Sequence, residues 1–206
     1  MANFSQDNRP YRIETPLGKD ELLLSEFTAV ERISAPYEIT ADLLSVDQAI
    51  TLKDLLRQPV SIHVNLASGD ERIMHGLVRE FSQLGRRDLL TAYRMVIVPS
   101  LWFMKLTRDS RIFQRKTVLD IVQAVFKSAG VKVQLECLKS YEKREYCVQY
   151  RESNFDFVSR LLEDEGIHYY FTHTKDGHTL VLDDDATNAV NCPGGAPAFM
   201  ASTPAP

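Results

Sequence analysis

Two segments in the first half of the chain alternate between apolar and polar residues. They are Tyr37–Leu43 and Val60–Leu66, and in each the side chains change character at every step. A period of two residues is the period of a β-strand, with one face against a core and the other in water. The pattern therefore predicts antiparallel strands that have one wet face, as in a barrel or a sandwich.

The rest of the first half carries turn signals between further strand candidates. Gly69-Asp70 predicts a hairpin turn, and Gly76, inside a strand candidate, predicts a bulge or a tight bend. The remaining candidates are strands over Glu21–Ile33, Arg72–Gln83 and Leu89–Val98, a turn at Gly85–Asp88, and a short helix over Thr51–Arg57.

After about residue 108 the pattern changes to helices mixed with strands. Apolar residues recur at helical spacing after Thr117, which is a good N-cap, and Gly130 is placed to end that helix. A second helix is predicted over Asn154–Glu165, with Ser153 as its cap and Gly166 at its end. The predicted strands are Val131–Glu136, Glu145–Tyr150, Ile167–His173 and His178–Asp183, the last two forming a hairpin around Lys175-Asp176-Gly177.

Together these patterns predict an α+β, mainly β fold. An antiparallel β-barrel-like domain is expected over residues 1–108, followed by helix–strand–helix–hairpin elements in an α/β segment over 109–185. Residues 186–206 carry no charge and are rich in Pro, Gly and Ala, which predicts a flexible tail. Because no capping element follows this tail, we expect the sequence to be a fragment of something longer.

Composition excludes several classes of protein. The chain has 206 residues, is 44% hydrophobic and 25% charged, and so has the make-up of a soluble globular protein. Its net charge of −4 and its short basic clusters disfavour a nucleic-acid partner. No apolar run approaches the roughly 20 residues of a membrane helix, and the polar segment Met1–Pro10 is no secretory signal. Cys137, Cys147 and Cys192 lack paired spacing, which favours reduced thiols.

Catalytic motifs are absent, so we predict no catalytic, cofactor-binding or metal-binding residues. There is no Gly-x-Ser-x-Gly, His-Glu-x-x-His, Cys-x-x-Cys or glycine-rich phosphate loop. Ser140–Lys143 matches Ser-x-x-Lys only by letters, since the lysine lies among charges in an expected loop. The acidic runs Glu163–Glu165 and Asp183–Asp185 are interpreted as solvated, and His63 and His75 as core or rim histidines.

Two functions of another class stay open. His173 and His178 flank the last turn and could approach each other, so a metal-dependent hydrolase would need Asp176 or Asp183 as a further ligand. A carbohydrate-binding module could use aromatic side chains for stacking. The aromatic runs are Trp102–Phe103 and Tyr169–Phe171; both are expected inside strands, and the second would have two apolar faces, one of which could meet a partner subunit.

The segment Tyr146–Phe171 reads YCVQYRESNFDFVSRLLEDEGIHYYF and resembles the VgrG family, the spike proteins of the bacterial type VI secretion system. A second stretch agrees with it, from Pro99-Ser-Leu-Trp102 through Arg108-Asp-Ser-Arg-Ile-Phe-Gln114 to the predicted helix after Thr117. The resemblance extends over about residues 10 to 185.

The resemblance implies a structural protein and no enzyme. Its fold would be that of the hub protein in the baseplate of contractile-tailed phages, assembled as a homotrimer that docks on the tube protein Hcp. Family members carry a puncturing needle, a PAAR tip and effectors through C-terminal regions that this sequence lacks. They are cytoplasmic before firing and are then secreted without a signal peptide. A phage tail hub or late control protein is the alternative within the same resemblance.

Overall fold

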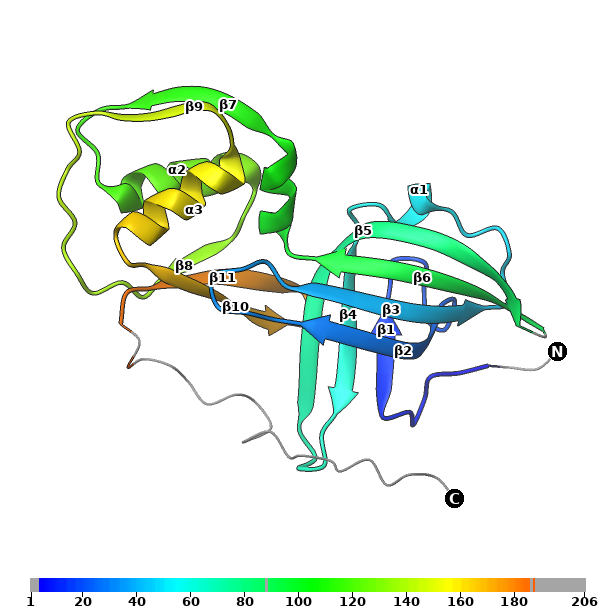
Figure 1. Cartoon of the computed structure of the whole chain (residues 1–206). Helices are drawn as coiled ribbons and strands as arrows, with labels where there is room; N and C mark the ends of the chain where they lie inside the picture. Colours follow the sequence, from blue (N-terminus) through cyan, green and yellow to red (C-terminus); the bar gives the residue numbers. More distant parts are fainter. Residues whose placement is uncertain (1–3, 88, 186, 188–206) are drawn as a thin grey trace, which may run out of the picture.

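The computed structural model describes residues 4–87, 89–185 and 187 (Figure 1). Its first part is a curled antiparallel sheet, a half-barrel, with the strand order β1-β4-β5-β6-β3-β2. The elements of this part are β1 (Tyr11–Glu14), β2 (Leu23–Val30), β3 (Glu38–Ser45), α1 (Leu52–Leu55), β4 (Pro59–Asn65), β5 (Glu71–Arg87) and β6 (Leu90–Val98).

The inner face of this sheet forms the first hydrophobic core. Ile39, Ala41 and Leu43 of β3 are buried in it together with Ile62 of β4, as the alternation predicts. The outer face of β4 differs from the prediction, because Ser61 is 4% exposed and His63 is 1% exposed. Charged side chains from the neighbouring strands cover these two polar residues and keep water away from them.

No bulge lies at Gly76. This residue pairs in regular register with Val60, and the bulges of β5 lie further along, between Val78 and Glu80 and between Gln83 and Gly85. A Cβ atom at position 76 would lie 2.5 Å from Cγ2 of Ile97 and 3.0 Å from the carbonyl oxygen of Val98. Glycine is therefore required here for close packing, which is the other reason for a glycine inside a strand.

The second part of the chain packs around its own hydrophobic core. It comprises the 3₁₀ helix η1 (Ser100–Leu106), β7 (Arg108–Phe113), α2 (Val118–Ala129), β8 (Val133–Leu135), β9 (Cys147–Ser153), α3 (Asn154–Asp164), β10 (His168–Thr174) and β11 (Gly177–Asp183). Strands β10, β11 and β8 form one sheet, with β8 parallel to β11, and β7 pairs with β9 in a two-stranded ribbon above the helices (Figure 1). The division at residue 108 stays a prediction; Leu101 and Met104 already belong to this second core.

The predicted helix ends are confirmed. Thr117 forms a capping box with Asp120, and Gly130 ends α2 at a φ of 69°. The Ser153 hydroxyl accepts a hydrogen bond from the backbone N–H of Asp156 at 3.0 Å, and Gly166 follows α3 at a φ of 68°. Both helices therefore begin and end where side-chain chemistry and glycine require.

Two local expectations are wrong, and a third is not tested. Gly85–Arg87 continue β5 instead of forming a turn, so that Arg87 pairs with Leu90. Trp102 and Phe103 lie in η1 and not in a strand, because the chain must turn there from the half-barrel into the second part. The predicted tail lies outside the described residues except for Thr187.

Candidate functional site: a histidine seam

Three histidines from different elements meet where the last hairpin contacts the half-barrel. His75 comes from β5, and His173 and His178 are cross-strand partners on β10 and β11. Both hairpin strands contact β5, and the rings of His75 and His178 lie with their centroids 5.2 Å apart. We call His75, His173 and His178 the histidine seam.

Hydrogen bonds show which ring nitrogens of His178 and His75 carry a proton. The backbone N–H of Ser100 donates to Nε2 of His178 at 2.9 Å, so a neutral His178 carries its proton on Nδ1. This Nδ1 lies 3.0 Å from Nδ1 of His75. Nδ1 of His178 therefore donates and Nδ1 of His75 accepts, and the contact requires Nδ1 of His75 to carry no proton.

His173 has a different set of partners. Its Nδ1 accepts from the backbone N–H of His75 at 3.1 Å, and its Nε2 lies 3.3 Å from Oε1 of Glu31. Nη2 of Arg72 donates to the other carboxylate oxygen of Glu31 at 2.5 Å. The Tyr37 hydroxyl donates to the carbonyl oxygen of His75 at 2.5 Å, and its ring lies 4.9 Å from the ring of His173.

This environment disfavours charge on the buried rings. Burial, followed by the nearby His75 and His173, lowers the pKa of His178 from 6.5 to about 3. Burial also lowers the pKa of His75, with His173 as the second cause. The hydrogen bond from His173 lowers the pKa of Glu31. His75 and His178, at the centre of the seam, are therefore neutral, and the carboxylate of Glu31 lies at its rim.

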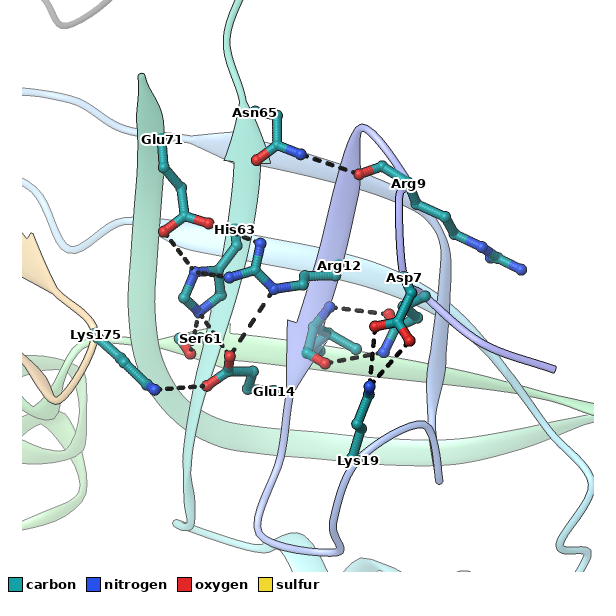
Figure 2. A network of polar contacts seen from close by, with 12 residues as sticks. Asp7, Arg9, Arg12, Glu14, Lys19, Ser61, His63, Asn65, Glu71 and Lys175 are labelled. Carbon is teal, nitrogen blue, oxygen red and sulfur yellow. Dashed lines mark hydrogen bonds and ion pairs between the residues drawn. The ribbon is translucent and has the colours of Figure 1, made fainter. Parts of the chain in front are cut away.

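A second polar cluster lies beside the seam, on the outer face of β1 and β4 (Figure 2). Nδ1 of His63 lies 3.1 Å from Oε2 of Glu71, and Nε2 of His63 lies 3.0 Å from the Ser61 hydroxyl. The hydrogen bond from His63 lowers the pKa of Glu71. Lys175, in the turn of the last hairpin, reaches Oε2 of Glu14 at 3.8 Å and so adds an ion pair between the hairpin and β1.

The ligands that the hydrolase alternative would need do not converge. His173 and His178 pair as expected, but Asp183 pairs with His168 at the other end of the hairpin. Five residues along a strand separate Asp183 from His178, which is about 17 Å. Within the described ranges, no group of three or more His, Cys, Asp or Glu side chains could hold a metal ion. The hydrolase alternative thus lacks its ligand set.

The aromatic run of β10 is used for packing. Tyr169 is 3% exposed, and Phe171 packs against both hydrophobic cores. The Tyr170 hydroxyl donates to Oε2 of Glu136 at 3.0 Å. These rings form no open stacking platform, so the carbohydrate-binding alternative is not favoured. Ser140 and Lys143 lie in a loop, as expected.

Sequence reasoning missed the groups that complete the seam. Glu31 and Ser100 carry no pattern that marks them, and Tyr37 counted only as the first apolar residue of an alternating strand. Each reaches the histidines across a large sequence separation, such as the 78 residues between Ser100 and His178. Among the described residues, no helix is long and apolar enough to cross a membrane.

Comparison with known proteins identifies relatives of the whole described chain. The family model for the phage tail baseplate hub (GPD) matches residues 30–205. The type VI secretion system spike protein VgrG1c of Pseudomonas aeruginosa is 40% identical over 193 residues, covering 93% of this chain and 26% of that protein. VgrG1a of the same species is 38% identical, covering 92% of this chain and 30% of that protein. The chain thus spans about a quarter of the length of these relatives.

Solved structures agree on the fold. An E. coli protein, c3393, is described as a type VI secretion component with structural similarity to the T4 tail proteins gp27 and gp5. It superposes with a TM-score of 0.78 at 23% identity, covering 87% of this chain and 51% of that one. A Francisella PdpA–VgrG complex gives a TM-score of 0.59 at 13% identity, covering 87% of this chain and 30% of that one. The predicted α+β, mainly β, hub-like fold is therefore confirmed, and the chain belongs to the phage tail baseplate hub family, within which it resembles the VgrG spike proteins of type VI secretion systems.

Proposed function

We propose that this chain is the hub part of a type VI secretion spike and that its role is structural. The observation that carries the proposal is the identity of 40% to a VgrG spike protein over 93% of the chain. The phage tail alternative is less favoured, since a prophage tail protein of similar fold shares only 15% identity. The architecture is compatible with a structural part, because it consists of a curled six-stranded sheet and a second packed core.

The partners and location of the whole protein follow from the same proposal. Copies of the protein would assemble as a homotrimer, dock on the tube protein Hcp, and carry a PAAR tip and effectors through further regions. The protein would be made in the cytoplasm without a signal peptide and leave the cell when the system fires. It would do this without an enzymatic step in the region described here.

The β7–β9 ribbon is the surface that we propose for contact with a second copy of the chain. Its outer face holds Val148 together with Ile112, Tyr146 and Tyr150, which are 61%, 57% and 67% exposed. Residues opposite or two apart on paired strands share a face, so these side chains form one apolar stripe. Contiguous exposed apolar surface of this kind marks interaction sites.

The backbone beside this stripe adds a second observation. Arg151 adopts a φ of 51°, which costs a non-glycine residue about 1–2 kcal/mol, and its guanidinium lies over the Tyr150 ring at 5.2 Å. Among the described residues, neither Arg151 nor the nearby Arg108 has an ion-pair partner. The chain carries a net charge of −4, so a second copy has more acidic than basic groups with which these cations could pair.

Secretion in a bacterium that encodes the full-length protein tests the function. Deleting the gene should stop release of the tube protein into the medium, and the wild-type gene should restore it. Ser140→Ala should restore it equally, because no catalytic step is proposed. Normal tube release without the gene would contradict the proposal.

Light scattering on the full-length protein tests the ribbon. Ile112→Asp and Tyr150→Asp should lower its mass in solution toward that of one chain. Leu138→Asp is the matched control, since Leu138 is 77% exposed in a loop away from the ribbon. Unchanged assembly in the ribbon variants would reject this surface and leave the spike function standing.

A further inference from the structure

We infer that the histidine seam is a proton-operated latch, which holds the turn end of the β10–β11 hairpin on β5 and releases it when the pH falls. This goes beyond the proposed function, which gives no role to any of the three histidines. The latch is a local device: the other end of β10 is held separately, where the backbone N–H of Ser34 donates to the carbonyl oxygen of Tyr169 at 2.8 Å.

His75 and His178, the central pair of the seam, share one proton between their Nδ1 atoms. The chain of bonds runs from the Ser100 N–H to Nε2 of His178, and from Nδ1 of His178 to Nδ1 of His75. A proton added to His75 at Nδ1 would face the N–H of His178 at 3.0 Å. A proton added to His178 at Nε2 would also face an N–H, that of Ser100 at 2.9 Å, but the Ser100 hydroxyl oxygen lies 3.0 Å from the same nitrogen and can accept it. The proton on Nδ1 of His75 is therefore the one that turns a hydrogen bond into a repulsive contact of two donors.

His173 lies beside the central pair and has an oxygen atom near each ring nitrogen. Its Nδ1 lies 3.2 Å from the carbonyl oxygen of His75, and its Nε2 lies 3.3 Å from Oε1 of Glu31. The backbone N–H of His75 donates to the same Nδ1 at 3.1 Å, so a proton added there would also meet a donor. After burial, His173 is the second cause that lowers the pKa of His75, and it also lowers the pKa of His178.

Other charged groups face the seam from every element that packs against it. The second carboxylate oxygen of Glu31 accepts a hydrogen bond from Arg72. Asp176, in the hairpin turn, favours the charged form of His75. Lys175 pairs with Glu14 on β1, outside the ring contacts. The Tyr37 hydroxyl donates to the carbonyl oxygen of His75, and burial raises the pKa of Tyr37, so it stays neutral. None of these groups forms a hydrogen bond with Nδ1 of His75, which contacts Nδ1 of His178.

The sign of the pH dependence follows from the direction of the shifts. The closed seam holds the pKa of His178 at about 3, against 6.5 for a free ring. The open state therefore binds more protons, and the closed state loses stability as the pH falls below about 6.5. Opening should have its midpoint between these two values and reverse on neutralisation.

Amide hydrogen exchange on this chain tests the latch, with exchange times corrected for the intrinsic effect of pH. Between pH 7.5 and pH 4.5, Thr172–Thr179 and the part of β5 around His75 should lose protection, while α2 and β3 keep theirs. His75→Asn retains an acceptor in the place of Nδ1 and removes one titrating ring, so opening should shift to lower pH. His168→Asn is the matched control, because His168 lies at the far end of the same hairpin.

A second variant keeps the test decisive if His75→Asn does not fold. His178→Gln offers the Ser100 N–H an acceptor in the place of Nε2 and removes the other titrating ring of the central pair, so the seam should open at a lower pH than in the wild type. Simultaneous loss of protection in the hairpin and in α2 would overturn the latch, because it would report global unfolding. Opening at the wild-type pH in these variants would overturn it as well.

Discussion

The side chain of Gln6 accepts a hydrogen bond from the backbone N–H of Leu24, at 3.0 Å from Oε1. The same oxygen accepts from the backbone N–H of Ile13 at 3.0 Å, and Nε2 donates to the carbonyl oxygen of Ile13 at 3.1 Å. Ile13 lies on β1 and Leu24 on β2, the two edge strands of the six-stranded sheet. One buried amide thus joins the edges at a point where no backbone ladder does, and it protects polar groups that an edge strand would expose.

Replacing Gln6 by leucine should therefore destabilise the half-barrel. Gln6→Leu keeps the volume but leaves two buried N–H groups and one carbonyl without their partner, which should cost about 2–4 kcal/mol of unfolding free energy. Unfolding in urea measures this loss of free energy. Gln48→Leu, at an exposed position, should change the free energy by less than about 0.5 kcal/mol. Equal effects of the two substitutions would contradict the role of Gln6.

Gly76→Ala should destabilise the chain through a steric contact alone. The new Cβ would lie 2.5 Å from Cγ2 of Ile97, so β5 and β6 would have to separate, at a cost of about 1–3 kcal/mol. Gly177→Ala is the matched control, because a Cβ there meets no atom within 4 Å. Thermal unfolding should show a lower midpoint for Gly76→Ala only; a similar drop in both variants would argue against close packing at position 76.

Gly166→Val should weaken the end of α3 by about 1–2 kcal/mol, since a φ of 68° is unfavourable for a β-branched residue. The N–H groups of Gly166 and Ile167 donate to the carbonyl oxygens of Glu163 and Leu162, at 3.1 and 2.8 Å, which needs this conformation. Gly166→Asn should lose less of the unfolding free energy than Gly166→Val, because asparagine tolerates the left-handed region. Chemical denaturation compares the two, and equal losses would point to a cause other than backbone conformation.

Arg144→Met should lower the free energy of unfolding, because acidic residues lie at the C-terminal end of α3. Nη2 of Arg144 lies 2.5 Å from Asp164 and 2.6 Å from Glu165, and it offsets their unfavourable interaction with the helix dipole. We expect a loss of about 1 kcal/mol at low salt and a smaller loss at about 1 M salt, where such charges are screened. Arg115→Met is the control, since Arg115 is 83% exposed and 3.8 Å from Glu145. A loss independent of salt would show that packing, and not charge, is responsible.

Local chemistry made much of the fold predictable. The alternation of Tyr37–Leu43 predicted the buried face of β3, and Thr117 and Ser153 marked the starts of both long helices, because capping depends on neighbours along the chain. Arg160 shows the limit of such reasoning: Asp156 and Asp164 lie four residues away on the same helix face, but Nη2 of Arg160 lies 2.7 Å from Oε1 of Glu152 on the preceding strand.

The sequence by itself determined the strand and helix periods, the helix ends and, through the motif of Tyr146–Phe171, the family, since all of these are written in residues close together in the chain. Only the tertiary structure decided that His75 meets His178, that Gln6 joins the two edge strands, that Gly76 lies against Ile97 and that Asp183 stands far from the histidine seam. The physical reason is that these relationships depend on strand register and on the crossing of one sheet over another. A single step of register would turn each of these side chains to the opposite face.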